Sequence, residues 1–311
     1  MIGAETSSQV EGPRASLAGP SDYLALLKPR VMSLVVFTAL AAMIAAPGSI
    51  HPVIASIALL CVAIGAGASG ALNQWYDADI DAIMTRTRKR PVPSGLISRQ
   101  AALEFGATLS LFSVMGMAFL VSYVAAALLA ITIAFYIFVY TMWLKRLTVH
   151  NIVIGGAAGA LPPVIGWAAV TGNAFDPAAW MLFLLIFLWT PPHFWALALA
   201  GSEDYARAKV PMLPVVQGSR ATRNQIVLYT LLMSVSAVAP YMLGYFGPVY
   251  GLTAALLSVV FIAMSVVLWR APEKTERKLA LSLFAFSIFY LFALFTALAA
   301  ERIVGLSPIA A

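Results

Sequence analysis

A ladder of oxygen-bearing side chains lies in the segment NQWYDADIDAIMTRTRKRPVPSG, residues 73–95. Asn73, Asp77 and Asp81 are each four residues apart, so on an α-helix they lie on one face, one turn above the next. Carboxylate oxygens suit Mg²⁺, which usually keeps several waters and takes substrate phosphates as its remaining ligands. The ladder therefore predicts a Mg²⁺ site for a substrate that carries phosphate.

Basic residues follow the ladder in the same segment. Arg86 and Arg90 taken alone would be interpreted as a topology signal, because Lys and Arg gather on the cytoplasmic side of membrane proteins. Their position directly after the ladder favours a second role, neutralising the phosphates. Asp79 lies about 200° round the helix from Asp77 and leaves the ladder face. Its simplest interpretation is a loop charge.

The composition indicates an integral membrane protein. The 311 residues are 61% hydrophobic and only 10% charged, whereas a soluble domain carries roughly a quarter of charged residues. The net charge of +6 is interpreted as cytoplasmic loops beside anionic lipid headgroups, so we expect a lipid bilayer and no nucleic acid as partner. Cys61 is the only cysteine, which excludes an intrachain disulfide.

Runs that lack Asp, Glu, Lys and Arg predict nine transmembrane helices, each near the roughly 20 residues that a span requires. The three longest runs hold two helices each, with breaks expected at 47–52, near 122–123 and near 247–248. We therefore expect an all-α polytopic fold. The runs are 31–76, 105–144, 147–175, 177–202, 224–269 and 280–300.

The basic residues orient these nine spans. All of the 19 Lys and Arg residues except Arg302 fall on one side, which the positive-inside rule makes cytoplasmic. Residues 1–22 are polar and lack the apolar core of a signal peptide, so we expect a disordered cytoplasmic tail. Residues 23–311 are then a single nine-helix transmembrane domain.

Two further loops on the same side carry groups that could join the ladder. The loop YTMWLKRLTVHN contributes Lys145 and Arg146. The loop GSEDYARAKVPMLP contributes Asp204 and Lys209. We expect these loops to bring a second acidic group and a second basic group to the Asp-rich segment.

A histidine lies deep in one predicted span, in WTPPHFWALALA. Pro191 and Pro192 remove two backbone donors and should kink this helix. His193 would share a face with Asp204 if the helix continues that far. Two interpretations stay open, a core histidine bonded to a freed carbonyl or a residue that binds the acceptor substrate. Pro162 and Pro163 similarly predict a kinked, closely packed helix in run 147–175.

The Asp-rich segment resembles the first motif, NxxxDxxxD, of the UbiA intramembrane prenyltransferases. The other residues of that segment are similar to those of the branch of the family that farnesylates protoheme IX. The same similarity extends to three later segments, which follow in the order YTMWLKRLTVHN, WTPPHFWALA and DYARAKVPMLPVV. One departure concerns the second motif. Ala208 stands where many relatives have the second Asp of DxxxD, so a second metal ion would have fewer carboxylates.

The resemblance implies a fold and a reaction. It implies nine helices around a central cavity, with the motif loops capping the cytoplasmic side of a bacterial inner membrane. It implies that farnesyl diphosphate and heme b are substrates, and that farnesyl transfer to a vinyl group with addition of water gives heme O. A downstream heme-modifying enzyme is a further expected partner.

The resemblance also implies roles for residues. Asn73, Asp77, Asp81 and Asp204 would hold Mg²⁺ on the diphosphate. His193 would orient heme, by an axial bond to iron or by a propionate contact. The residues expected to pair with phosphate oxygens are Arg86, Arg90, Lys145, Arg146 and Lys209.

Two alternatives share parts of this pattern. A prenyltransferase that acts on a quinone or on another tetrapyrrole would need the same diphosphate residues, and only its acceptor would differ. A cation transporter would need ionisable groups near mid-membrane and on both sides. The acidic groups of this chain gather on one side, and its outer half is nearly free of charge, which disfavours transport.

Overall fold

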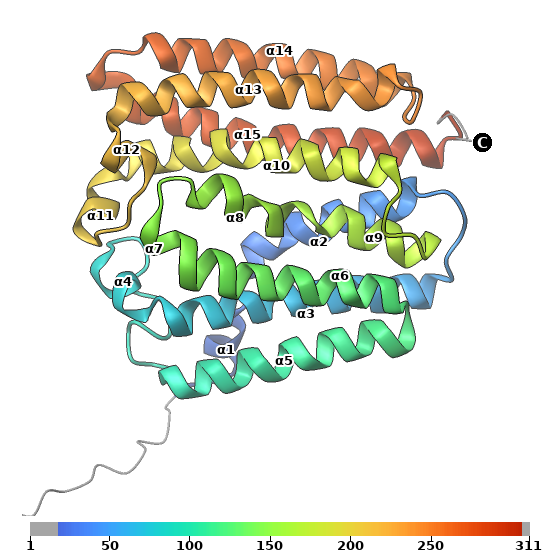
Figure 1. Ribbon diagram of the computed structural model, residues 1–311, viewed down its shortest axis with the longest axis horizontal. Helices are drawn as coiled ribbons and strands as arrows, with labels where there is room; N and C mark the ends of the chain where they lie inside the picture. The colour runs from blue at the N-terminus through green and yellow to red at the C-terminus, as the bar shows by residue number, and fades with distance from the viewer. Residues whose placement is uncertain (1–17, 307–311) are drawn as a thin grey trace, which may run out of the picture.

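The computed structural model describes residues 18–306, and every regular element within them is a helix. The long helices run side by side in one bundle (Figure 1). They are α2 (Pro29–Ala45), α3 (Pro52–Tyr76), α5 (Arg99–Leu120), α6 (Tyr123–Ala134), α8 (Asn151–Ala160), α9 (Pro162–Thr171), α10 (Pro177–Ala200), α13 (Gly218–Met242), α14 (Pro248–Arg270) and α15 (Glu273–Ile303). The shorter helices are α1 (Pro20–Leu26), α4 (Ala78–Ile83), the π-helix η1 (Phe135–Leu144), α7 (Lys145–Leu147), α11 (Ser202–Arg207) and α12 (Leu213–Val216).

The number of spans agrees with the sequence. Within the described part of the chain, 8 helical stretches are long and apolar enough to cross a membrane. The pair α1 and α2, bent by 56°, makes the count 9 if it forms one span. The predicted tail, residues 1–22, falls mostly outside the described residues, and its last three, Pro20 to Asp22, already belong to α1.

Contacts between the helices form a closed circuit. It runs from α2 to α3, to α6 with η1, to α8 with α9, to α10, to α15 and back to α2. Outside this circuit α5 packs on α3, whereas α13 and α14 cover α10 and α15 (Figure 1). Across the circuit α9 packs against α2 so closely that a Cβ on Gly166 would lie 2.3 Å from the carbonyl oxygen of Ala39.

The two proline pairs act differently on their helices. The kink predicted at Pro162 and Pro163 coincides with an interruption of the helix, because α8 ends at Ala160 and α9 begins at Pro162. Pro191 and Pro192 lie inside α10, which continues to Ala200. Gly201 then separates α10 from α11, which carries Asp204. The condition under which His193 and Asp204 would share a face, a helix that continues from one to the other, is therefore not met.

A ten-residue π-helix, η1, completes the span that α6 begins. Its wider i→i+5 turn is rare and often marks a functional site. The ring of Tyr140 fills the space over Gly155 of α8, where an added Cβ would lie 2.2 Å from Tyr140 Cδ2. A glycine on α8 thus lets η1 approach closely, at the end of the span where Lys145 follows.

The short helices α4, α7, α11 and α12 all lie at one end of the bundle (Figure 1). We call this the motif end, because all four helices come from the motif-bearing loops. Many large apolar side chains on the bundle are exposed, for example Phe112 at 64% and Phe119 at 69%. Such a surface suits lipid rather than water. Because the charged motif loops lie at one end of this apolar bundle, that end is where a soluble ligand can reach charged groups.

Candidate active site

The ladder spans the junction between α3 and α4. The N–H of Asp77 donates to the carbonyl of Asn73 at 2.9 Å, and the N–H of Asp81 donates to the carbonyl of Asp77 at 2.8 Å. Helical i→i−4 bonding therefore persists across the junction, as the spacing predicts. All three side chains are buried, and Asp77 has no exposed surface. A buried carboxylate is costly unless it is paired, so the partners of Asp77 define the site.

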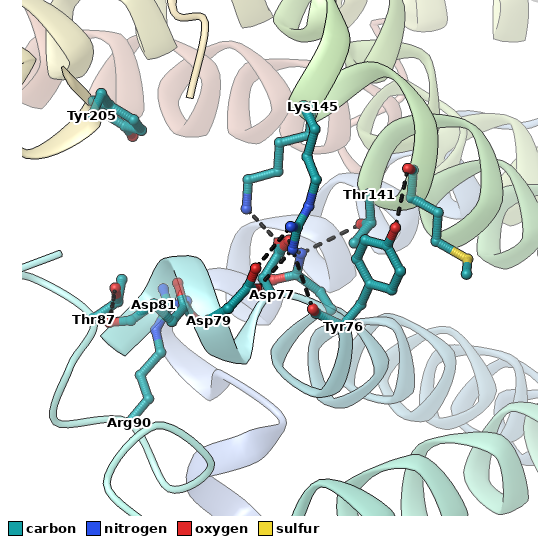
Figure 2. Close-up of polar contacts among 12 residues, drawn as sticks. Tyr76, Asp77, Asp79, Asp81, Thr87, Arg90, Thr141, Lys145 and Tyr205 are labelled. Atoms are coloured by element: carbon teal, nitrogen blue, oxygen red, sulfur yellow. Dashed lines mark hydrogen bonds and ion pairs between the residues drawn. The ribbon is translucent and has the colours of Figure 1, made fainter. Parts of the chain in front are cut away.

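Asp77 is held by two cations from another span. Lys145 Nζ forms an ion pair with Asp77 Oδ2, and Arg146 Nη2 lies 3.4 Å from Asp77 Oδ1. Asn73 Nδ2 donates to the same Oδ2 at 2.7 Å. Figure 2 shows Lys145 reaching Asp77 from the end of η1. The predicted approach of this loop to the ladder is thus seen at the level of individual atoms.

A third cation approaches Asn73 from the corner between α1 and α2. Lys28 Nζ donates to Asn73 Oδ1 at 2.8 Å. The backbone of Lys28 is left-handed, with φ 54° and ψ 57°, a conformation that costs a residue with a Cβ about 1–3 kcal/mol. From the sequence, Lys28 is only one of the Lys and Arg residues that mark the cytoplasmic side. The signal available in the sequence was Pro29, because a proline disfavours helical backbone geometry at the residue before it.

A glycine on α3 allows the corner between α1 and α2 to pack closely against α3. A Cβ on Gly70 would lie 3.3 Å from the carbonyl oxygen of Leu26. One turn further, Gln74 Nε2 donates to that same carbonyl at 3.0 Å. Gln74 thereby satisfies a carbonyl that α1 leaves free at its C-terminus, and it fixes the corner that presents Lys28 to the ladder.

Asp81 has a separate partner. Arg90 Nη1 lies 2.7 Å from Asp81 Oδ2, and Thr87 Oγ1 donates to the carbonyl of Asp81 at 2.9 Å. In Figure 2, Arg90 approaches Asp81 from the side opposite to Lys145. The loop after α4 therefore folds back on the ladder and neutralises its last carboxylate.

Asp79 has a role that the sequence did not indicate. It leaves the ladder face and is 56% exposed, yet both of its carboxylate oxygens accept from Arg146 at 2.8 Å. These hydrogen bonds lower the pKa of Asp79 to about 2. Arg146 also lies over the ring of Tyr76, 4.9 Å from its centroid. The interpretation of Asp79 as a plain loop charge is wrong, because Asp79 holds Arg146 beside Asp77.

The second motif lies apart from Asp77. Asp204 pairs with Arg207, whose Nη2 also donates to Thr85 Oγ1 at 2.9 Å. Arg86 Nη2 donates to the hydroxyl of Tyr205 at 3.1 Å, and Tyr205 stands well away from Asp77 in Figure 2. Arg86, Asp204 and Tyr205 share a pocket of about 220 Å³. Its remaining lining residues are Met84, Leu197, Ala200, Gly201, Arg277 and Leu281.

The Lys209 side chain does not contact the other residues predicted for the site. Its backbone is left-handed, with φ 53°, and its side chain is exposed. Within residues 18–306 this side chain forms no hydrogen bond or ion pair. A role in binding phosphate would therefore depend on the ligand itself.

His193 lies at the interface of α10 and α15. Its imidazole is 8% exposed, and its Nδ1 is 2.6 Å from the hydroxyl oxygen of Ser287. The partner is thus a side chain of another helix, whereas the core interpretation expected a carbonyl freed by the prolines. Ser287 was not singled out from the sequence, since nothing local marks it.

The donor set at the ladder fits Mg²⁺ in part. Amide and carboxylate oxygens are hard ligands of the kind this ion takes, and those of Asn73, Asp77 and Asp81 are buried. Each carboxylate is already neutralised by its own cation. Among the described residues, no group of three or more His, Cys, Asp and Glu lies close enough to hold a metal ion. A metal here would need waters or phosphate oxygens to complete its ligands.

Residues 34–300 match the UbiA prenyltransferase family. The chain belongs to this family. Two relatives named protoheme IX farnesyltransferase come from Rhodopseudomonas palustris and Afipia carboxidovorans. The first is 58% identical over 291 residues, 93% of this chain and 92% of the relative. The second is 59% identical over 288 residues, 92% of this chain and 91% of the relative.

Solved structures share the UbiA fold at low sequence identity. A digeranylgeranylglyceryl phosphate synthase has a TM-score of 0.74 at 19% identity and covers 91% of this chain and 98% of its own. A UbiA homologue from Archaeoglobus fulgidus bound to DMAPP and Mg²⁺ has a TM-score of 0.58 at 16% identity, covering 88% and 99%. These solved structures show the fold that the chain shares. In this chain the ladder lies at the junction of α3 and α4, at the motif end of the helical bundle.

Proposed function

We propose that this prenyltransferase transfers a farnesyl group from farnesyl diphosphate to a vinyl group of protoheme IX (heme b). The bond between the farnesyl carbon and the diphosphate oxygen breaks, and a carbon–carbon bond to the vinyl group forms. The hydroxyl of water adds to the remaining vinyl carbon, and its proton leaves with the diphosphate, giving heme O. The acceptor is inferred from the relatives named protoheme IX farnesyltransferase, which are 58% and 59% identical to this chain.

The observation that carries the diphosphate part is the set of three cations around Asn73 and Asp77. Lys28, Lys145 and Arg146 come from two separate parts of the chain and meet at these two buried side chains. The cations of this cluster suit the oxygens of a diphosphate, and its carboxylates suit the Mg²⁺ that a diphosphate carries. Mg²⁺ bound by Asn73, Asp77 and Asp81 would neutralise charge that develops on the leaving diphosphate. Asp204, in the second motif, is the carboxylate proposed for a second metal position.

The cations act on the same leaving group. Lys145, Arg146 and Lys28 donate to oxygens at the ladder, so they are already directed to the place where phosphate oxygens would lie. Donors fixed in advance stabilise the separating charge in the transition state more than the ground state. Arg86, Arg90 and Lys209 are proposed as additional partners of the phosphate.

The acceptor and the membrane complete the proposal. His193 orients the heme, and the farnesyl chain lies among the apolar helices. The protein resides in a bacterial inner membrane with its motif end in the cytoplasm, because the predicted spans place every Lys and Arg except Arg302 on the side of the motif-bearing loops. This orientation gives the ladder access to a water-soluble diphosphate head.

The reaction is tested with purified protein in detergent, heme b, farnesyl diphosphate and Mg²⁺, with and without EDTA, followed by mass spectrometry. We expect heme to gain one farnesyl group and one water, and this product to be absent with EDTA and in Asp77→Asn. Glu104→Gln is the matched control, because Glu104 is exposed on α5 and, in the part of the chain that the structure describes, its carboxylate bonds only Gln100.

Two other outcomes would change the proposal in different ways. If the wild type left heme unchanged but prenylated a quinone precursor, the acceptor assignment would be wrong and the diphosphate site would stand. If no acceptor led to consumption of farnesyl diphosphate, the assignment of the ladder to catalysis would fail.

A further inference from the structure

Both faces of the His193 imidazole are covered by aromatic rings. Trp189 stacks on one side with a centroid distance of 4.2 Å and an interplanar angle of 19°. Phe284 of α15 stacks at 4.5 Å and 27°. The ring can therefore contact a substrate only through its edge, where its two nitrogens lie.

One of these nitrogens is committed to Ser287. His193 Nδ1 lies 2.6 Å from Ser287 Oγ, and the same Oγ lies 2.6 Å from the carbonyl oxygen of Phe284. A carbonyl only accepts, so the single hydroxyl proton of Ser287 is directed to Phe284. Ser287 Oγ then accepts from His193, and the imidazole carries its proton on Nδ1.

The second nitrogen, Nε2, is left with a lone pair. A neutral imidazole that carries hydrogen on one nitrogen offers the other as an acceptor or a metal ligand. Within residues 18–306, Nε2 of His193 has no hydrogen-bond partner. Trp189 holds the arrangement in place, because its Nε1 donates to the carbonyl of Ser287 at 2.9 Å while its ring covers the imidazole.

We propose that Ser287 is a positioning residue that fixes the Nδ1–H tautomer of His193, so that Nε2 coordinates the iron of the heme acceptor. The inference rests on the proposed function, since it requires a heme substrate. A lone pair can bind iron but cannot donate a hydrogen bond to a propionate. The sequence left two ways for His193 to bind heme, an axial bond to iron and a contact with a propionate. The Nδ1–H tautomer favours the axial bond. Histidines that bind metals are commonly held in this way by a partner on the other nitrogen.

Binding of two porphyrins separates iron from propionate recognition. Heme b and metal-free protoporphyrin IX carry the same propionates, and their affinities for the purified protein are measured by quenching of tryptophan fluorescence. We expect His193→Ala and Ser287→Ala to weaken heme b binding, Ser287→Ala by about tenfold or more. Neither should change the affinity for protoporphyrin IX. The absorption spectrum of bound heme should also shift in both variants.

Two further variants separate positioning from folding. Ser287→Thr keeps the hydroxyl and should restore the heme affinity and the absorption spectrum of the wild type. Ser258→Ala is the matched control, because Ser258 is also buried but bonds Tyr290. It should leave both porphyrin affinities unchanged.

The inference would be overturned by an equal loss of affinity for both porphyrins in His193→Ala, which would indicate a propionate contact. It would also be overturned if Ser287→Ala bound heme b with the affinity and spectrum of the wild type. A wild type that binds no heme while it prenylates another acceptor would instead refute the proposed function, and the inference with it.

Discussion

The ammonium nitrogen of Lys28 lies 2.8 Å from Oδ1 of Asn73. Lys28 comes from the corner between α1 and α2, and Asn73 from the last turn of α3. With Lys145 and Arg146 on Asp77, this contact encloses the start of the ladder with cations from two distant segments. The left-handed backbone of Lys28 is unfavourable for lysine, so the surrounding packing must hold it in place.

Replacing Lys28 with methionine tests whether this cation serves the diphosphate. A charge-assisted hydrogen bond is worth about 1.5–3 kcal/mol, so we expect kcat/KM for farnesyl diphosphate to fall by about 10- to 100-fold. Folding should be retained, because Asn73 is uncharged and leaves no buried charge unpaired. Arg30→Met is the control, since Arg30 is exposed on the same corner. An unchanged kcat/KM in Lys28→Met would remove Lys28 from the site.

The pairing of every ladder carboxylate with a cation predicts that Mg²⁺ and diphosphate bind cooperatively. Mg²⁺ alone must compete with Lys145 and Arg146 for Asp77, whereas a diphosphate offers those cations a new partner. We expect a small rise in Tm with Mg²⁺ alone and a much larger one with Mg²⁺ and farnesyl diphosphate together. Equal shifts with and without the diphosphate would show that the ladder binds the metal independently.

The pair of Asp79 and Arg146 predicts a specific pH range. The pKa of Asp79 is lowered to about 2 by Arg146, from an ordinary value of about 3.9. A lowered pKa contributes stability above the ordinary value, and this contribution is lost as the pH falls toward the lowered one. The Tm difference between wild type and Asp79→Asn should be constant above about pH 5. It should shrink between about pH 4 and pH 2, and a change near neutral pH would point to another group.

The contact of α9 with α2 predicts an asymmetry between two glycines of one broken span. A Cβ on Gly166 would lie 2.3 Å from the carbonyl oxygen of Ala39, whereas a Cβ on Gly159 would meet nothing within 4 Å. The obstacle at Gly166 is backbone, which cannot rotate away. We expect Gly166→Ala to destabilise the protein by about 1–3 kcal/mol, and Gly159→Ala to have almost no effect, measured by thermal unfolding in detergent. Similar effects of both substitutions would exclude close packing as the reason.

The sequence by itself determined the helices and the ladder. Long runs without charge can only be buried in lipid as helices, because every backbone group must find its hydrogen bond within the segment. Helix ends follow from proline and glycine, as at Pro162 and Gly247–Pro248. The spacing of Asn73, Asp77 and Asp81 is a property of one continuous segment, so local rules were sufficient to align them.

Only the tertiary structure decided which cation meets which carboxylate. Lys145 reaches Asp77, while Arg86 reaches Tyr205, although both cations were expected at the same phosphate. Such pairings join residues far apart in the chain, and they depend on helix packing that no local pattern records. The π-helix η1, the left-handed corner at Lys28 and the bond between His193 and Ser287 belong to the same class, because each is stable only when another helix packs against it.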